Sequence, residues 1–265
     1  MVNSSITIYT LPCLSDNYAY VVHNRATGTA AVVDVPEAGP LVDKISQLNL
    51  PVTDIFLTHH HWDHIDGLPD LQAALTGSLG QSRARVIGAK ADSHRLPALD
   101  QAVGPGDRVT LCGIEGDIYD VSGHTLGHLA LHLPSAKAVF SADSLMAMGC
   151  GRLFEGSAEQ MWHSLQQFRS LAPDTWVYSG HEYTATNMAF TQSLGEDNPA
   201  IAARAGQITK DRAAGQATVP SLLSIELQTN PFLRVDDPAL QAAVGMPGAT
   251  AEQVFTEIRS RRDKF

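Results

Sequence analysis

The segment Thr58–Gly67, THHHWDHIDG, carries four histidines and two aspartates within eight positions, directly after the apolar run DIFL. The apolar run predicts a buried strand, and helical spacing resumes after the segment, so we expect a strand-to-helix loop at the rim of a sheet. Side chains two apart in extended backbone face the same way, so His59 and His61 can share one ion while His60 points elsewhere. The side chains of Asp63 and His64, nearer the helix, would point to a position beside that ion. The segment therefore favours an α/β fold with a functional site at a sheet edge.

The alternative is a polar loop whose histidines only make hydrogen bonds, but the pattern H-x-H-x-D-H after a strand favours metal binding. Imidazole and carboxylate groups are ligands for zinc, iron or manganese rather than for calcium or copper(I). Three later segments offer more donors, each at an expected strand end: His124 in SGHTLGH, Asp143 in FSADSL and His181 in YSGHEYT. Together these are five histidines and two aspartates, enough for two ions with a carboxylate between them and room for a water molecule.

Composition narrows the class of protein. The chain has 265 residues, of which 44% are hydrophobic, and this suits one large domain or one domain with a smaller partner. A formal net charge of -10 disfavours binding to nucleic acid or to an anionic membrane. The N-terminus lacks the pattern of a signal peptide, and three widely spaced cysteines indicate neither a disulfide framework nor a cysteine-rich zinc site. We expect a cytoplasmic monomer without nucleic-acid or membrane partners.

The order of predicted elements indicates an α/β body followed by a helical part. Residues 6–11, 17–24 and 28–35 predict an antiparallel meander of strands. Further strands are predicted at 52–58, 84–89, 116–123, 129–134, 138–143 and 174–180, and helices at 40–50, 68–75 and 157–171. From Thr184 onward the segments are helical or irregular with no convincing strand. We place the boundary between domains of residues 1–180 and 181–265.

The motifs, taken in order, resemble those of the metallo-β-lactamase fold superfamily. H-x-H-x-D-H, G-H-T-x-G-H, an Asp after an apolar strand and G-H-E-Y-T follow one another as in that superfamily. GCGRLFEG, GHEYT with Asn187, and the terminal RSRRDKF are similar to the glyoxalase II family, the hydroxyacylglutathione hydrolases, over nearly the whole length. The resemblance implies a four-layer αββα sandwich with a helical C-terminal domain that contributes to glutathione binding.

Carried over onto this sequence, the resemblance implies that His59, His61 and His124 hold a first metal and Asp63, His64 and His181 a second, with Asp143 bridging them. Asp63 and Asp143 would be the catalytic carboxylates. The implied cofactors are two divalent ions, zinc first, with iron or manganese as alternatives. The implied reaction hydrolyses S-(2-hydroxyacyl)glutathione, with S-D-lactoylglutathione giving D-lactate and glutathione in the second step of methylglyoxal detoxification. A thioester suits such a site because its thiolate leaving group has a solution pKa of about 8.5.

The same resemblance implies a glutathione site lined by Arg152, Phe154, Tyr183, Asn187, Arg259 and Arg262. Without the resemblance, RSRRDK is a solvated helix end whose cations complement the helix dipole. Some family members carry Lys where Arg152 stands and Tyr where Phe154 stands, and Phe154 cannot donate a hydroxyl hydrogen bond. We expect a structural role for Cys150 and a role for His128 in supporting a metal ligand. Gly127 and Gly151 are expected to permit tight turns.

Proteins with other functions would share only some of these sequence features. A glutathione persulfide dioxygenase of the same superfamily would use one iron, and the complete second set of donors argues against it. A lactonase or β-lactamase keeps the hydrolytic centre but should lack the glutathione segment. A non-enzymatic metal-binding protein would tend to close its coordination sphere with protein ligands. A nuclease would want a basic surface, which a net charge of -10 does not favour.

Overall fold

The structure is a computed structural model that describes residues 5–265 of the chain. Contacts between Cα atoms divide the chain into two compact units. The first comprises Met1–Asp120 and Gly127–Phe140, and the second comprises Val121–Leu126 and Ser141–Phe265. Each unit contains segments that are distant in sequence. The expected domain boundary after residue 180 stays a prediction.

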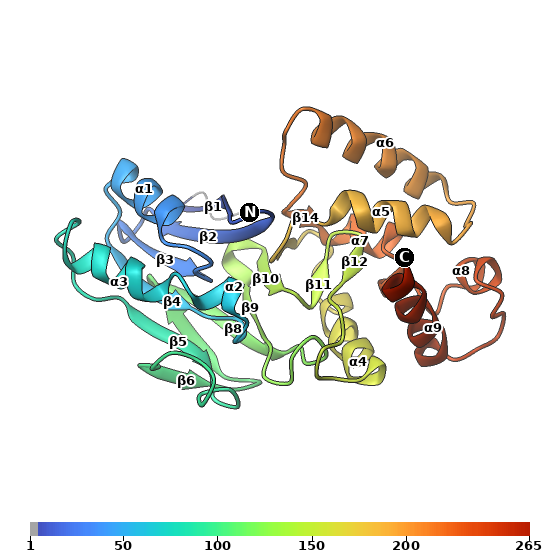
Figure 1. Cartoon of the computed structure of the whole chain (residues 1–265), viewed down its shortest axis with the longest axis horizontal. Coiled ribbons are helices and arrows are strands. Elements are labelled where there is room, and N and C mark those ends of the chain that lie inside the picture. The colour runs from blue at the N-terminus through green and yellow to red at the C-terminus, as the bar shows by residue number, and fades with distance from the viewer. Residues whose placement is uncertain (1–4) are drawn as a thin grey trace. The chain divides into compact units, whose positions relative to one another are not determined.

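The first sheet has six strands in the order β1-β2-β3-β4-β5-β6 (Figure 1). These strands are β1 (Ile6–Cys13), β2 (Asn17–Asn24), β3 (Thr29–Val33), β4 (Val52–Phe56), β5 (Arg85–Ala89) and β6 (Gln101–Val103). The pairs β1–β2 and β2–β3 are antiparallel, which confirms the predicted meander. From β3 to β6 the neighbours run parallel. The carboxyl ends of β3 and β4 therefore reach the same edge of the sheet.

The second sheet also has six strands, in the order β14-β13-β10-β9-β8-β7. These strands are β7 (Arg108–Leu111), β8 (Ile114–Asp120), β9 (Leu129–Leu133), β10 (Ala138–Ala142), β13 (Trp176–Ser179) and β14 (Ser221–Leu222). Strands β7 to β10 pair antiparallel in sequence order. A separate hairpin of β11 (Leu145–Met146) and β12 (Gly149–Cys150) follows β10.

Apolar side chains fill the space between the two sheets within the first unit. The rings of Tyr20 on β2 and Phe140 on β10 lie 5.4 Å apart. Asn24 Nδ2 on β2 donates to the carbonyl oxygen of Cys112, between β7 and β8, at 2.9 Å. This hydrogen bond satisfies a buried amide and links the two sheets. Burial of apolar area of this kind supplies the main favourable term in folding.

Helices α1 (Gly39–Leu48) and α3 (Leu68–Thr76) belong to the first unit and lie beside its first sheet (Figure 1). Helix α1 buries Leu41 and Ile45, and α3 buries Leu71 and Leu75, each pair four residues apart. This spacing places the buried side chains on one face of each helix, as a surface helix requires. The short helix α2 (Trp62–Ile65) precedes α3 and carries part of the His-rich segment.

The second unit is mainly helical. Its helices are α4 (Ala158–Arg169), α5 (Thr184–Ser193), α6 (Pro199–Ala213), α7 (Leu223–Thr229), α8 (Pro238–Ala243) and α9 (Ala251–Lys264). Capping boxes begin α4 at Ser157 and α9 at Thr250, where side-chain oxygens satisfy the first free N–H groups. Met148, Met188, Ile201 and Ile208 form an apolar cluster that joins α5 to α6.

The prediction that no strand follows Thr184 is wrong at one point. Ser221 and Leu222 form β14 and pair with Val177 and Trp176 of β13. Two residues are too few to show the alternation by which a strand is recognised in a sequence. The pairing depends on the edge of β13, which only the tertiary structure provides.

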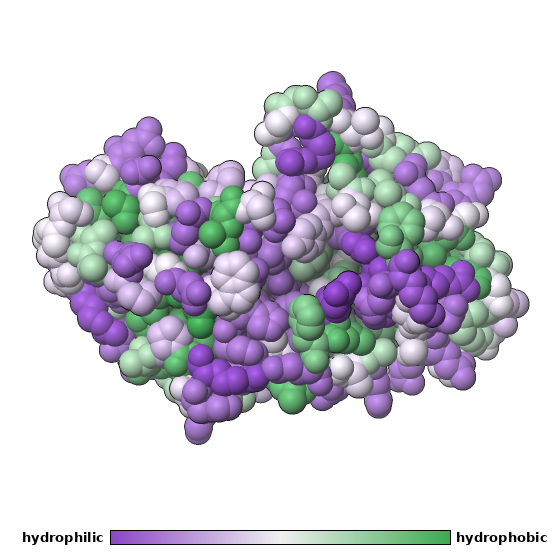
Figure 2. All heavy atoms as spheres, viewed as in Figure 1, coloured by the Kyte–Doolittle hydropathy of each residue, from purple (hydrophilic) through white to green (hydrophobic). Residues whose placement is uncertain are grey.

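Hydrophilic and intermediate residues cover most of the face seen in Figure 2, where apolar residues form small separate groups. Many large apolar side chains are inside, such as Phe56, Phe168 and Phe255, each less than 2% exposed, although others, such as Trp62, are exposed. Within residues 5–265 none of the helices has the length and apolar character needed to cross a membrane.

Candidate metal centre

The His-rich segment leaves the buried strand β4 and enters α2, as the sequence predicts. Val52–Phe56 is flanked by parallel strands on both sides, so its carboxyl end delivers the chain to the sheet edge. His59 and His64 are fully buried, and His61 is partly exposed. Asp63 and His64 lie in the single turn of α2, whose first bond runs from His64 N–H to the carbonyl of His61 at 3.0 Å.

Asp34 at the end of β3 holds this segment. Its Oδ1 accepts the backbone N–H of Thr58 at 2.8 Å, and its Oδ2 accepts the Thr58 hydroxyl at 2.8 Å. The same Oδ2 lies 2.8 Å from His64 Nδ1. A carboxylate can only accept, so His64 carries its proton on Nδ1 and keeps Nε2 as a lone-pair donor.

Through the Thr58 hydroxyl, Asp34 also determines which ring nitrogen of His59 carries the proton. Its hydrogen goes to Asp34, so its oxygen accepts from His59 Nδ1, which lies 3.0 Å away. His59 then presents Nε2 as its lone-pair atom. Asp34 was not among the predicted site residues, although, like Asp143, it directly follows an apolar strand.

His60 points away from this group, as expected from the alternation. Its Nδ1 lies 3.1 Å from Asp92 Oδ2, and Asp92 is also paired with Arg95 at 2.6 Å. A Cβ on Gly127 would approach Asp92 Cγ to 2.2 Å. Gly127 lies in a turn, as expected, and the close approach of Asp92 is a second reason for glycine there. His128 stacks on His59 with ring centroids 4.6 Å apart.

The remaining donors form a second cluster around Asp143, which follows β10. Its Oδ2 lies 3.4 Å from His124 Nε2 and 3.2 Å from His181 Nε2. His124 Nδ1 is 2.8 Å from the carbonyl oxygen of Arg152 and donates to it, which leaves Nε2 for the lone pair. A Cβ on Gly151 would lie 1.8 Å from the carbonyl oxygen of Asp143, so only glycine allows this approach.

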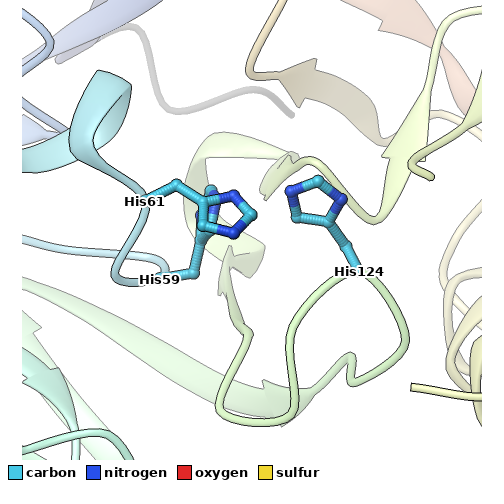
Figure 3. A group of neighbouring side chains, drawn as sticks. All are labelled: His59, His61 and His124. Atoms are coloured by element: carbon cyan, nitrogen blue, oxygen red, sulfur yellow. The ribbon is translucent and has the colours of Figure 1, made fainter. Parts of the chain in front are cut away.

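Ligand atoms of the predicted donors come together in three groups, within each of which all atoms lie inside 4.8 Å of one another. The groups are His59, His61 and His124; His59, His64 and Asp143; and Asp63, His64 and His181. Figure 3 shows the rings of the first group, with His59 and His61 coming from one segment and His124 from another.

The chemistry of these residues fits a metal. The set combines neutral imidazoles with carboxylates, and the protons of His59, His64 and His124 are held on Nδ1 by oxygen acceptors. A cluster of lone pairs in a largely buried place needs a cation to offset their repulsion. Seven donors in overlapping groups are consistent with a dinuclear metal site.

Side chains expected to bind substrate lie beside these donors. The Tyr183 ring stacks on His181 with centroids 4.7 Å apart, and the Phe154 ring meets His124 edge-on at 5.2 Å. Phe154 is 61% exposed, so its ring is accessible from solvent beside His124. The Arg152 side chain is also more than half exposed.

The two arginines of α9 differ in their surroundings. Arg262 Nη2 donates to Asn187 Oδ1 at 3.3 Å, and burial, followed by the positive charge of Arg259, lowers the pKa of Arg262. Arg259 is almost fully buried and donates through Nη1 to the carbonyl of Cys150 at 3.0 Å. Its other terminal nitrogen pairs with Asp263 at 2.9 Å. The expected contact of Arg259 with substrate stays a prediction.

Cys150 is in a position that suits a structural role. It is buried on β12, and burial raises the pKa of its thiol to about 11. A thiol that stays protonated at neutral pH is a poor nucleophile.

Comparison with protein families matches two parts of the chain. Residues 15–80 match the metallo-β-lactamase superfamily, and residues 182–265 match the C-terminal part of hydroxyacylglutathione hydrolases. A hydroxyacylglutathione hydrolase of Ruegeria pomeroyi is 53% identical over 98% of this chain and 99% of its own length. Another from Jannaschia sp. is 54% identical over 97% of this chain and 98% of its own length.

Solved structures share the fold at lower identity. The BLEG-1 B3 metallo-β-lactamase has a TM-score of 0.64 at 18% identity, covering 86% of this chain and 99% of that chain. ETHE1 from Myxococcus xanthus has a TM-score of 0.62 at 22% identity, covering 96% of this chain and 90% of that chain. These likenesses confirm the predicted metallo-β-lactamase fold and carry no argument about the reaction.

Proposed function

Since the chain belongs to the hydroxyacylglutathione hydrolase family of the metallo-β-lactamase superfamily, we propose that it hydrolyses S-D-lactoylglutathione to D-lactate and glutathione. The observation that carries this proposal is the overlap of three donor groups built from five histidines and two aspartates. A centre of this kind suits attack of water on a carbonyl carbon. The thioester also has a leaving group that departs as a thiolate with little help from an acid, because the thiol pKa is about 8.5.

In this proposal His59, His61 and His124 hold one divalent ion, and Asp63, His64 and His181 hold the other. These two sets coincide with two of the three groups of clustered ligand atoms. Asp143 would help to hold both ions, and its Oδ2 lies within 3.4 Å of two imidazole nitrogens, which supports this role. Zinc is our first choice, with iron or manganese as alternatives that the same donors accept. The bound ions would lower the pKa of a shared water and stabilise the oxyanion.

The protein groups around these donors keep them in place. Asn17 Nδ2 donates to Asp63 Oδ2 at 3.1 Å and to the Asp63 carbonyl at 2.9 Å, so the carboxylate is held at one oxygen. A carboxylate fixed in this way can orient a water molecule or accept its proton. Asp34 and Thr58 keep the imidazoles of His59 and His64 in the tautomer that presents Nε2.

For the glutathione moiety we propose a site formed by Arg152, Phe154, Tyr183, Asn187 and Arg262, with Arg259 behind it. Glutathione carries two carboxylates, and cations recognise such groups through charge-assisted hydrogen bonds. Burial, followed by the positive charge of Arg259, lowers the pKa of Arg262, and a carboxylate bound beside these cations would offset both effects. The proposal places a monomeric enzyme in the cytoplasm, where a reducing environment suits three free, buried cysteines.

The deciding experiment compares the hydrolysis of S-D-lactoylglutathione, a lactone and a β-lactam by one preparation whose metal content is measured. We expect rapid cleavage of the thioester and little of the other two. Roughly two ions per chain should be present, and their removal should abolish activity. Preference for the lactone or β-lactam, oxidation of glutathione persulfide by an iron-loaded sample, or full activity without metal would contradict the proposal.

A further inference from the structure

The carboxylate of Glu182 joins the segment that contains His181 to the segment that follows α6. Its Oε2 accepts the backbone N–H of Thr218 at 2.8 Å, and its Oε1 accepts the Thr218 hydroxyl at 2.6 Å. Arg212 Nη1, at the end of α6, lies 3.2 Å from Oε2, and the Glu182 side chain is only 7% exposed. One nearly buried carboxylate thus accepts both hydrogen-bond donors of Thr218 and pairs with a cation. Charge-assisted bonds of this kind are stronger than neutral ones.

Glu182 stands between two residues of the proposed site. His181 Nε2 lies 3.2 Å from Asp143 Oδ2, and the Tyr183 ring is stacked on the His181 ring with their planes 4° apart. Because the three residues are consecutive, an anchor on the middle one limits the backbone rotations that aim the two rings. Among the described residues, the three groups of clustered ligand atoms do not include Glu182, whose carboxylate contacts Thr218 and Arg212.

The segment after α6 is exposed at residues 214–217 and becomes buried at Val219, just before Ser221 pairs with β13. Ala217, Thr218 and Pro220 line a cavity of ≈ 450 Å³ together with residues of α6 and α7. A segment with solvent on one side and a cavity on the other depends on its polar contacts for its position. The contact with Glu182 therefore fixes Thr218 at the point where the exposed part of this segment ends.

We propose that Glu182 is a positioning residue, which through Thr218 fixes the orientation of His181 and Tyr183 and thereby strengthens binding of the ion that His181 holds. This inference rests on the proposed function, in which His181 is a metal ligand. Groups that orient metal ligands without touching the metal commonly change metal affinity by about 10–100-fold. Glu182 acts through the backbone, so we place its effect at the lower end of that range.

The test measures zinc binding by the full-length protein and does not depend on catalysis. Zinc is removed by a chelator of known affinity, and the metal that remains per chain is determined at each chelator concentration. In Glu182→Ala we expect one of the two zinc ions to bind about tenfold more weakly and the other to bind as in the parent. Glu182→Gln should recover part of the loss because its amide oxygen still accepts the Thr218 hydroxyl. Thr218→Val, which removes that hydroxyl at nearly constant shape, should weaken the same ion.

Two matched variants serve as controls. Glu115→Gln alters a carboxylate that accepts the Thr110 hydroxyl on the exposed pair β7–β8, and Thr209→Val removes a hydroxyl that bonds the Ala205 carbonyl within α6. Neither should change zinc binding. Combining Glu182→Ala with Thr218→Val should weaken the ion no more than Glu182→Ala alone, because both changes break one contact.

Unchanged zinc binding in the Glu182 variant would contradict the proposal. If Glu182→Ala retains both zinc ions as tightly as the parent while its unfolding midpoint falls, Glu182 stabilises the fold and positions nothing. If that variant does not fold, Glu182→Gln and Thr218→Val decide by the same titration. Failure of the proposed function would be visible in the parent itself, which would bind fewer than two ions or leave the thioester uncleaved.

Discussion

Asp34 Oδ2 lies 2.8 Å from His64 Nδ1, and both side chains are buried. Asp34 also bonds Thr58, whose hydroxyl accepts from His59. One carboxylate at the end of β3 therefore sets the tautomer of an imidazole in each of the two proposed metal sets. A residue outside the donor groups thus decides which nitrogen atoms are offered to a metal.

Replacing Asp34 should weaken metal binding more than it changes the substrate contacts. We expect Asp34→Ala to lose metal affinity by about 10–100-fold, because His59 and His64 lose the acceptors that fix their tautomers. Metal content after dialysis against a weak chelator measures the loss, and saturating zinc should restore part of kcat. Asp70→Ala on α3, an exposed aspartate, provides the control. Parent-like metal retention in Asp34→Ala would contradict the role that we assign to Asp34.

Asp143 should matter for the rate rather than for substrate affinity. Its Oδ2 lies close to His124 Nε2 and His181 Nε2, where a carboxylate can contact two ions. We expect Asp143→Ala to lower kcat by several orders of magnitude with a much smaller change in KM, because the position of the nucleophile depends on both ions. Steady-state kinetics with measured metal content tests this. An unchanged kcat at full metal loading would show that Asp143 does not bridge.

The two arginines of α9 should respond differently to substitution. Arg262→Ala should raise KM about tenfold or more with little change in kcat, since a charge-assisted contact contributes roughly 1.5–3 kcal/mol and the carboxylate lies far from the reacting carbonyl. Added salt should raise KM of the parent more than that of the variant.

Arg259→Ala should act first on stability, because the buried carbonyl of Cys150 loses its donor at an expected cost of about 1–3 kcal/mol. Urea unfolding and KM measured on both variants separate the two roles. A larger KM effect for Arg259→Ala, with stability unchanged, would instead place the Arg259 guanidinium on the substrate.

The buried cysteines predict a loss of stability at alkaline pH. Burial raises the thiol pKa of Cys13 and Cys112 to about 12 and that of Cys150 to about 11, from an ordinary value of 9.0. A group whose pKa is raised on folding stabilises the fold fully below its unfolded pKa, and this contribution falls as pH rises toward the folded value. The urea midpoint should therefore decline from pH 9 upward.

A serine substitution isolates this effect, because a serine hydroxyl does not ionise in that range. Cys112→Ser should be less stable than the parent at pH 8, and its midpoint should decline less steeply between pH 9 and pH 11. A parallel decline in both proteins would show that other groups cause the alkaline loss.

The sequence by itself determined which candidate donor residues the structure would bring together and the general plan of the fold. H-x-H-x-D-H after the strand at 52–58 was informative because alternation in extended backbone places His59 and His61 together and sends His60 away, as the structure confirms. The meander, the helices predicted at 40–50 and 157–171 and observed at 39–48 and 158–169, and the change to helical character after residue 184 follow from periodicity, which depends only on local geometry.

The tertiary structure decided what depends on residues distant in sequence. Asp34 and Asp92 meet His64 and His60 only because the fold brings separate strands and loops together, so the sequence does not show which aspartate pairs with which histidine. Strand β14 required the free edge of β13, and Gly151 required the carbonyl of Asp143. Arg259 and Arg262 lie near the same helix end, and the sequence does not distinguish their roles. Packing does, because it buries Arg259 against the carbonyl of Cys150 on β12 and leaves Arg262 only partly covered.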